Sequence, residues 1–203
     1  MSDSPRKEKV RLRVHFGERA GKCSAAERVK ASARIRERLE EQAVWREARS
    51  VLFFAPLPEE PDIWPLMSEA LRLGKPIALP RYSKSDDSYL AYRVSDLERD
   101  LQPGHFGIRE PSLTCAPFPL DELSLTLVPG VGFGLNGGRL GRGKGYYDRL
   151  LARIPGWKCG VAFDWQVVPR LPVEPHDVCM DSLVTPTSWL ETRSGTAGSE
   201  SPS

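Results

Sequence analysis

A glycine-rich segment between an expected strand and an expected helix constrains this chain more than any other feature. Leu123, Leu125 and Leu127 alternate with polar residues, which is the period-two pattern of a strand. Eight glycines follow within residues 130–145, and apolar side chains at helical spacing begin at Tyr147. Glycines let backbone N–H groups converge, and the start of a helix favours anions. The segment therefore predicts a polyphosphate site.

Two familiar phosphate-binding motifs fit this segment poorly. Residues 132–137 spell G-x-G-x-x-G, but further glycines follow where a dinucleotide-binding fingerprint opens directly into a helix. Residues 138–144 spell G-x-x-x-x-G-K, but Gly145 stands where a P-loop has Ser or Thr for Mg²⁺. We therefore reject the first motif and regard a standard P-loop as disfavoured.

Three cations, Arg139, Arg142 and Lys144, lie within the same glycine-rich segment. Their density favours an anion site over the plainer alternative, a flexible surface loop with scattered charge.

Length, charge and cysteine spacing set the bounds on fold and location. A chain of 203 residues suggests one domain, expected over residues 1–190, and the polar tail 191–203 is expected to be disordered. The net charge of +2 gives no bulk field for nucleic acid, and no apolar run is long enough to span a membrane. Four cysteines without C-x-x-C pairing, and no secretory apolar core, favour a cytoplasmic protein with reduced thiols. We expect a monomer without nucleic-acid or membrane partners.

Buried runs and amphipathic stretches alternate along the chain. Ser24 and Glu27 form a capping-box pattern at the start of a helix. The expected helices cover 7–16, 24–48 and 63–73, and the expected strands cover 51–55, 76–80, 89–93, 123–128 and 158–163. Strand–helix–strand order predicts a parallel sheet. The expected fold is a single-domain, three-layer α/β/α arrangement with a mainly parallel, Rossmann-like sheet.

Residues 139–148 read RLGRGKGYYD, which resembles the signature of the 5-formyltetrahydrofolate cyclo-ligase family, also called methenyltetrahydrofolate synthetases. Residues 104–111 and 181–185 resemble further family segments, so the similarity runs from about Lys9 to Thr185. One position departs from the pattern, because Gly134 stands where many relatives carry Asp. The departure suggests a looser loop in this chain.

The resemblance implies a site for ATP. Arg142 and Lys144 are the expected catalytic cations, acting on the transferring phosphoryl group. In the family, a Lys and an Arg near the N-terminus reach the ATP phosphates, and Lys9 and Arg13 match their spacing. The ATP-binding residues implied are Lys9, Arg13, Arg139, Leu140, Gly141, Arg142, Gly143, Lys144, Gly145, Tyr146 and Tyr147.

The resemblance also implies sites for folate and for a metal ion. Ala55, Glu60 and Tyr146 are the expected substrate-binding residues. Glu59 is a rival for the role of Glu60, because the Thr that usually follows in relatives is missing here. The residues that match the family's Mg²⁺-binding aspartates are Asp148 and Asp177.

The implied reaction converts 5-formyltetrahydrofolate to 5,10-methenyltetrahydrofolate, with ATP as co-substrate, Mg²⁺ as cofactor, and ADP and phosphate as products. It passes through a phosphorylated formyl intermediate. Two alternatives remain open at this point. One is a nucleotide- or RNA-binding module that uses the basic N-terminus. The other is a different phosphate-handling enzyme, such as a sugar-phosphate isomerase or transferase, on the same fold.

Overall fold

The computed structural model describes residues 4–104 and 107–192 of the chain, and a seven-stranded sheet stands at its centre. The strands of this sheet are β1 (Val51–Leu52), β2 (Ile77–Ser83), β3 (Ser88–Val94), β6 (Leu125–Val128), β9 (Trp157–Val161), β11 (Ser182–Val184) and β12 (Trp189–Glu191). Their order is β12-β11-β9-β6-β1-β2-β3. The inner strands pair in parallel, and only the edge strands β3 and β12 are antiparallel to their neighbours. The mainly parallel sheet is therefore confirmed.

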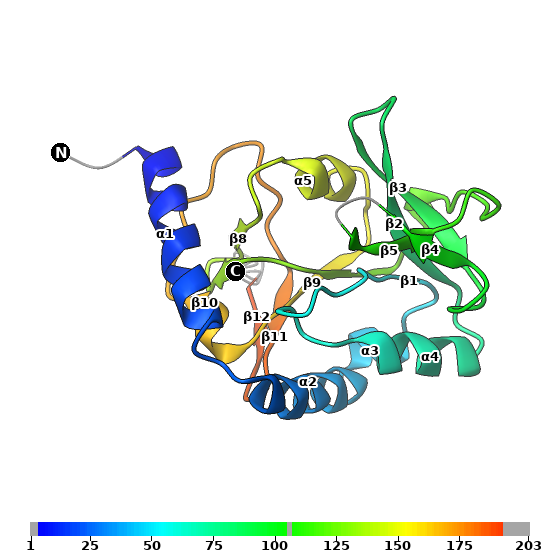
Figure 1. Cartoon of the computed structure of the whole chain (residues 1–203), viewed down its shortest axis with the longest axis horizontal. Coiled ribbons are helices and arrows are strands. Elements are labelled where there is room, and N and C mark those ends of the chain that lie inside the picture. Colours follow the sequence, from blue (N-terminus) through cyan, green and yellow to red (C-terminus); the bar gives the residue numbers. More distant parts are fainter. Residues whose placement is uncertain (1–3, 105–106, 193–203) are drawn as a thin grey trace, which may run out of the picture.

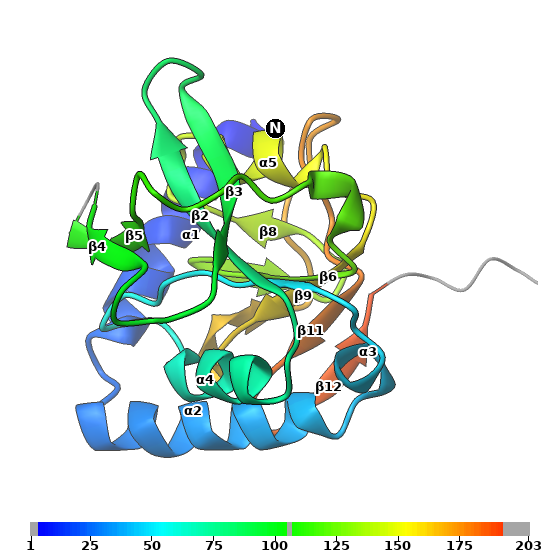
Figure 2. The same cartoon turned by 90° about the vertical axis from the view of Figure 1, so that its right-hand side faces the viewer.

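Helices cover both faces of the sheet. They are α1 (Pro5–Ala20), α2 (Ala25–Glu40), α3 (Ala43–Arg46), α4 (Trp64–Arg72) and α5 (Tyr146–Leu151). Figures 1 and 2 show α2, α3 and α4 on one face and α5 on the other, while α1 stands at one side of the molecule. The main core lies under α2 and α4, where Ile35, Leu39 and Met67 have no exposed surface. No helix in the described part of the chain has the length and apolar character needed to cross a bilayer.

The helix after Ser24 begins as expected and ends early. Glu27 N–H donates to Ser24 Oγ at 3.2 Å, and Ser24 N–H donates to Glu27 Oε2 at 2.8 Å, which completes the capping box. The expected extent to residue 48 is wrong, because α2 ends at Glu40. The chain then turns, and α3 places Trp45 in the core, edge-on to Phe53. A separate short helix therefore replaces the last expected turns.

Helix α1 is longer than expected, and two of its side chains are buried. Only Lys9 and Phe16 are buried on it. Phe16 lies so close to Gly132 that a Cβ at that glycine would come within 2.2 Å of the ring. Gly132 therefore provides the close approach between α1 and the small three-stranded sheet, which consists of β10 (Val167–Val168), β7 (Gly132–Gly134) and β8 (Arg139–Leu140).

Strand order reverses beside β1. The chain goes from β1 to β2 and β3 on one side, and then returns to β6, β9 and β11 on the other. A two-stranded ribbon, β4 (Leu101–Pro103) and β5 (Arg109–Pro111), intervenes between β3 and β6. The loops that follow β1 and β6 therefore diverge at a topological switch point. In open α/β sheets, that crevice is where ligands bind.

The folded part extends slightly past the expected boundary at residue 190. Glu191 belongs to β12, and the Thr192 hydroxyl donates to the carbonyl of Met180. The rest of the expected tail, 193–203, lies outside the described residues. All four cysteines are free thiols, as their spacing predicted.

Candidate active site

The first half of the glycine-rich segment forms a hydrogen-bonded hairpin. Strands β7 and β8 pair in antiparallel register, and β10 adds a third strand. Gly134 N–H donates to the Gly138 carbonyl at 2.9 Å, and Gly137 N–H donates to the Gly134 carbonyl at 2.9 Å. The expectation of one continuous loop from 130 to 145 is therefore wrong. Residues 141–145 form the irregular connection that leads from β8 into α5.

Gly134 does not loosen the hairpin as expected. A Cβ there would come within 2.2 Å of Asn136 Oδ1 and 2.7 Å of the Leu171 nitrogen. Asn136 occupies that space with two hydrogen bonds, because its Oδ1 accepts from Leu171 N–H at 3.1 Å and its Nδ2 donates to the Leu171 carbonyl at 3.0 Å. The Asn136 amide therefore bonds the hairpin to the backbone of Leu171. An Asp side chain at position 134 would clash with this amide.

Arg139 and Asp148 form a largely buried ion pair between the hairpin and α5. Arg139 Nη2 lies 2.9 Å from Asp148 Oδ2, and the two side chains are 4% and 21% exposed. The guanidinium carbon lies 5.5 Å from the centre of the Tyr147 ring. The i, i+4 spacing of Lys144 and Asp148 would place both on one side of a helix, but α5 begins only at Tyr146, so that interpretation of the spacing is wrong. The connection around Lys144 is too glycine-rich to extend the helix backwards.

The N-terminal helix reaches the site through two cations. Lys9 Nζ lies 2.7 Å from Glu174 Oε2 and 2.5 Å from Asp177 Oδ2. Arg13 Nε donates to the Gly141 carbonyl at 2.9 Å. Burial opposes the charge of Lys9, but the two carboxylates outweigh it and raise the Lys9 pKa. Lys9 therefore stays protonated at neutral pH and lies against residues 174–177, whereas Arg13 contacts the family signature at Gly141.

The two expected metal ligands have different partners. Asp148 is bound to Arg139 and Asp177 to Lys9, and within the described chain no contact joins one carboxylate to the other. Asp177 instead groups with Glu174 and His176, whose potential ligand atoms lie within 4.8 Å of one another. Burial raises the pKa of Asp177, but Lys9 and a backbone N–H overcome it, so this carboxyl has a lowered pKa and is ionised at neutral pH.

Arg142 bridges the crevice at the switch point. Its Nη2 lies 2.8 Å from Glu59 Oε1 and 3.6 Å from Glu60 Oε1, in the loop that follows β1. The Glu60 side chain is only 12% exposed, and it accepts a hydrogen bond from Leu57 N–H at 3.0 Å. Ala55 is buried at the end of the same strand run. The structure thus brings together the expected catalytic arginine and both candidate folate-binding glutamates.

Glu59 and Glu60 differ in environment, although they are neighbours. Burial raises the pKa of Glu60, and neither Leu57 N–H nor Arg142 fully compensates. Burial also raises the pKa of Glu59. The hydrogen bond and charge of Arg142, with smaller contributions from other groups, together outweigh burial, so the pKa of Glu59 is lowered. A recessed carboxylate with a raised pKa is the type of group that marks a functional site, whereas Glu59 resembles an ordinary ion-pair partner.

A tyrosine cluster lies beside the start of α5. The Tyr146 ring centre lies 5.2 Å from that of Tyr82 and 5.7 Å from that of Tyr89, while Tyr147 lies 5.4 Å from Tyr89. Burial raises the pKa of Tyr89 to about 12 and that of Tyr147 well above its usual range. Tyr82 and Tyr89 were missed as site residues. The sequence does not show that these two tyrosines lie opposite each other in the register of β2 and β3.

The remaining expected ATP-binding residues occupy the connection into α5 and its flanks. Leu140 is buried in the cluster around Phe16, so its side chain supports the hairpin. Gly143 and Gly145 have φ values of +95° and +69°, which L side chains rarely adopt. Lys144 is exposed, and it makes no hydrogen bond or ion pair to any residue that the structure describes. It is therefore available to a ligand.

The raised pKa of Glu60 predicts how stability depends on pH. Above its ordinary pKa of 4.5, folded Glu60 holds its proton longer than unfolded Glu60, so rising pH lowers the free energy of unfolding through that window. Glu60→Gln should therefore gain stability relative to the parent as pH rises from below 4.5, as measured by urea unfolding at several pH values. Glu59→Gln is the matched control with the opposite sign, because a lowered pKa makes the ionised form stabilising. A difference for Glu60→Gln that does not change with pH would contradict this reading.

Comparison with known proteins identifies the family. A family model described as the 5-formyltetrahydrofolate cyclo-ligase family matches residues 5–186. The 5-formyltetrahydrofolate cyclo-ligase of Mus musculus is 27% identical over 189 residues, covering 85% of this chain and 91% of the relative. That of Escherichia coli (strain K12) is 33% identical over 148 residues, covering 71% and 81%.

Solved structures agree with the sequence match. The NMR structure of Aquifex aeolicus 5,10-methenyltetrahydrofolate synthetase has a TM-score of 0.83 at 35% identity, covering 92% of this chain and 94% of that chain. A 5,10-methenyltetrahydrofolate synthetase from Mycoplasma pneumoniae has a TM-score of 0.71 at 20% identity, with 88% and 99% covered, and supports the fold alone. With the family signature gathered at one crevice, this chain is an enzyme that belongs to the 5-formyltetrahydrofolate cyclo-ligase family.

Proposed function

We propose that this enzyme converts 5-formyltetrahydrofolate to 5,10-methenyltetrahydrofolate, and that it uses ATP and releases ADP and phosphate. The observation that carries the proposal is the family match over residues 5–186, which includes the signature at residues 139–148. Membership in an enzyme family argues against the binding-module alternative and against a different phosphate-handling enzyme.

The proposed chemistry needs an activated formyl group. The formyl oxygen attacks the γ-phosphorus of ATP, the bond to the β-phosphate oxygen breaks, and ADP leaves. The N10 amine of the same substrate then attacks the formyl carbon, loses its proton as the ring closes, and expels phosphate with the formyl oxygen. Both steps depend mainly on positioning and on neutralising phosphate charge.

The cations around the connection at 141–145 suit that task. The side chains of Arg142 and Lys144 are exposed, so they can meet an incoming phosphoryl group. Arg13 stands behind the same connection through its bond to the Gly141 carbonyl. Arg139 is different, because its charge is already committed to Asp148 in a buried pair. We therefore assign Arg142 and Lys144 to the transferring phosphoryl group and Arg139 to support of the connection.

The carboxylates of Asp148 and Asp177 would hold Mg²⁺, since a hard cation prefers oxygen ligands. When bound, Mg²⁺ neutralises charge on phosphate oxygens. Asp177 now neutralises Lys9, so an ATP polyanion arriving at the site would compete for Lys9 and release a carboxylate oxygen. Lys9 would then bind phosphate as well as anchor α1.

Folate would occupy the crevice between the loop after β1 and α5. The recessed Glu60 carboxylate faces Arg142 there, and it can accept hydrogen bonds from the donor-rich edge of a pterin. Tyr146 contributes an aromatic face beside Tyr82 and Tyr89. Ala55 is buried in the run that follows β1.

The direct test follows the methenyl absorbance band after the enzyme is mixed with Mg-ATP and 5-formyltetrahydrofolate. ADP release should depend on the folate, and omission of either substrate should abolish the absorbance change. Strong, salt-dependent RNA binding without any ATP turnover would instead favour the binding module.

Glu60→Gln should raise the KM for folate roughly tenfold or more, with little change in the KM for ATP. The variant keeps the size of the side chain but loses a charge-assisted hydrogen bond, which typically contributes about 1.5–3 kcal/mol. Steady-state kinetics with each substrate varied in turn separates the two KM values. Glu59→Gln is the neighbouring control. A larger folate effect from Glu59→Gln than from Glu60→Gln would move the role to Glu59.

A further inference from the structure

The loop at residues 56–61, which carries the recessed Glu60, is fixed at both of its ends. Ala55 is buried before it and Ile63 is buried after it. Three prolines restrict its backbone. Glu60 N–H donates to the Leu57 carbonyl at 2.9 Å, and Leu57 N–H donates back to the Glu60 carboxylate at 3.0 Å. Because these bonds and the prolines limit movement within the loop, the anchor at its far end also determines where Glu60 lies.

Helix α2 holds the far end of this loop at the backbone of Asp62. Asp62 N–H donates to the Ser32 hydroxyl at 3.0 Å, and Arg36 Nη1 donates to the Asp62 carbonyl at 2.7 Å. Ser32 is only 2% exposed, so its bond is shielded from water. The Asp62 carboxylate accepts from Trp64 N–H at 3.0 Å, at the start of α4. The backbone of one loop residue is therefore gripped on both sides by α2.

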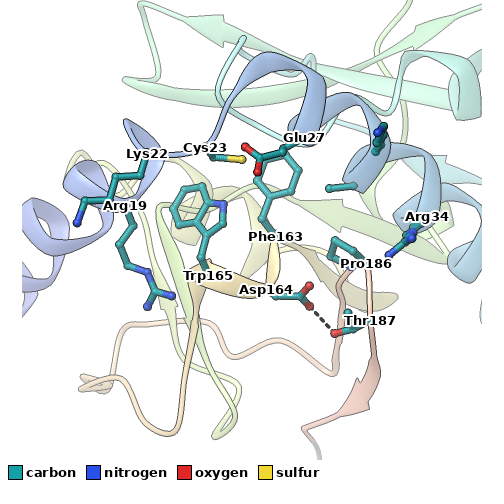
Figure 3. A pocket seen from close by; sticks show the side chains of 12 residues that line it. Arg19, Lys22, Cys23, Glu27, Arg34, Phe163, Asp164, Trp165, Pro186 and Thr187 are labelled. Atoms are coloured by element: carbon teal, nitrogen blue, oxygen red, sulfur yellow. Dashed lines mark hydrogen bonds between the residues drawn. The ribbon is translucent and has the colours of Figure 1, made fainter.

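The residues that hold the loop share one face of α2. Arg28, Ser32 and Arg36 follow one another at intervals of four, which places them on one side of a helix. Arg28 also interacts electrostatically with Glu59 in the loop. A different side of the helix, which includes Arg34, borders a cavity of about 500 Å³ (Figure 3). The loop is thus held by one defined face of α2.

The residue type at position 32 is explained by the loop and not by the helix. Serine is a weaker helix former than alanine, because its hydroxyl competes for backbone hydrogen bonds. An alanine at this buried position would therefore favour α2 itself, and it would lose the bond to Asp62. A polar residue that weakens its own helix and holds a neighbouring loop points to a role for the loop's position.

We propose that Ser32 and Arg36 are positioning residues for folate, which hold the backbone of Asp62 and thereby keep Glu60 in place to meet the pterin. The proposal rests on the proposed function, which supplies folate as the ligand of Glu60. If either bond is lost, the loop samples other positions, and folate binding then has to order it at a cost in affinity. The proposal extends the folate site to a helix outside the family signature.

Calorimetric binding of 5-formyltetrahydrofolate to the full chain tests the role of Ser32. Ser32→Ala leaves Asp62 N–H without its acceptor, and the Kd for folate should rise roughly threefold to tenfold, the range expected for one lost hydrogen bond. An unchanged Kd would overturn the inference.

Ser50→Ala is the matched control for loss of a buried serine. Ser50 is 4% exposed, and its hydroxyl donates to the Glu122 carbonyl at 2.5 Å, but it precedes β1 and so lies at the other end of that strand from the loop. Urea unfolding should show a loss of stability in both serine variants, whereas only Ser32→Ala should bind folate more weakly. Equal increases in Kd would show that Ser32 has only a structural role and would overturn the inference.

Arg36→Met provides a second test at a partly exposed side chain. The Kd for folate should rise roughly threefold or more, and Arg36→Lys should recover part of the affinity, because an ammonium group can still donate to the Asp62 carbonyl. Arg34→Met, on the cavity side of the same helix, should leave the Kd for folate unchanged. Equal effects of Arg34→Met and Arg36→Met, or no recovery with Arg36→Lys, would overturn the role of Arg36.

Steady-state kinetics separates this inference from the proposed function. In Ser32→Ala and Arg36→Met, the KM for folate should rise with the Kd, while kcat and the KM for ATP stay within about twofold of the parent values. If the parent forms the methenyl product and both variants bind folate like the parent, only this inference fails. If the parent binds folate without any turnover, the proposed function fails, and the Kd values still decide the inference. A parent that binds no folate would overturn both.

Discussion

Arg142→Ala should lower kcat at least roughly a hundredfold, about 2.7 kcal/mol, while ATP still binds. Phosphoryl transfer spreads charge over equatorial oxygens, so a positioned cation matters more in the transition state than in ground-state binding. The position of Arg142 supports this role, because it spans the crevice to Glu59 with a half-exposed side chain that can turn toward a ligand. Steady-state kcat and both KM values provide the measurement.

Two further variants make the Arg142 experiment specific. Arg142→Lys should restore only part of the rate, since a point charge cannot reproduce the guanidinium fork. Arg153→Ala removes another exposed arginine close to α5, and it should leave kcat near the parent value. Near-normal turnover of Arg142→Ala would show that Arg142 is a solvated ion-pair partner. Lys144 would then be the principal catalytic cation.

Asp148→Asn should lower the free energy of unfolding by about 3 kcal/mol or more, which is the usual cost of removing one partner of a buried ion pair. The Arg139 side chain is only 4% exposed, and its Nε already lacks a hydrogen-bond partner among the described residues. Urea unfolding measures the loss. Asp177→Asn is the comparison, and it should cost less because Lys9 keeps Glu174 as a partner. Equal losses for the two variants would contradict this explanation.

The same variant also tests the proposed metal role, provided that it is assayed where it remains folded. Asp148→Asn should raise the Mg²⁺ concentration needed for half-maximal turnover more than it raises the KM for folate, because a charged oxygen ligand is lost. Replacing both members of the pair, Arg139→Met with Asp148→Leu, should recover much of the stability without recovering the Mg²⁺ response. An unchanged Mg²⁺ response in Asp148→Asn would remove this residue from the metal site.

Local patterns predicted the framework of this enzyme well. The run from Val51 to Ala55 was readable as buried because every side chain in it is apolar, although only Val51–Leu52 form the strand β1. The Ser24–Glu27 cap was readable because both partners lie within one helical turn. The early end of α2 was not predictable from the sequence, because it depends on the contact between Trp45 and Phe53 in the folded core.

The candidate site was predictable only as far as its motif reached. Residue types and spacing identified Arg142 and Glu60, but nothing local indicates that they meet across the crevice. The hairpin within the glycine-rich segment was missed because its strands are short and glycine-rich, which hides the usual alternation.

The contact between Lys9 and Asp177 has a consequence for how the chain is made. These residues are 168 positions apart, so the first helix to leave the ribosome must wait for nearly the last part of the fold before its buried ammonium finds its partners. Closing a loop of that length costs entropy that only the finished sheet can offset. A nascent chain that lacks residues 174–177 therefore cannot form the contacts of Lys9. The proposed nucleotide site would be complete only when that late segment has been made.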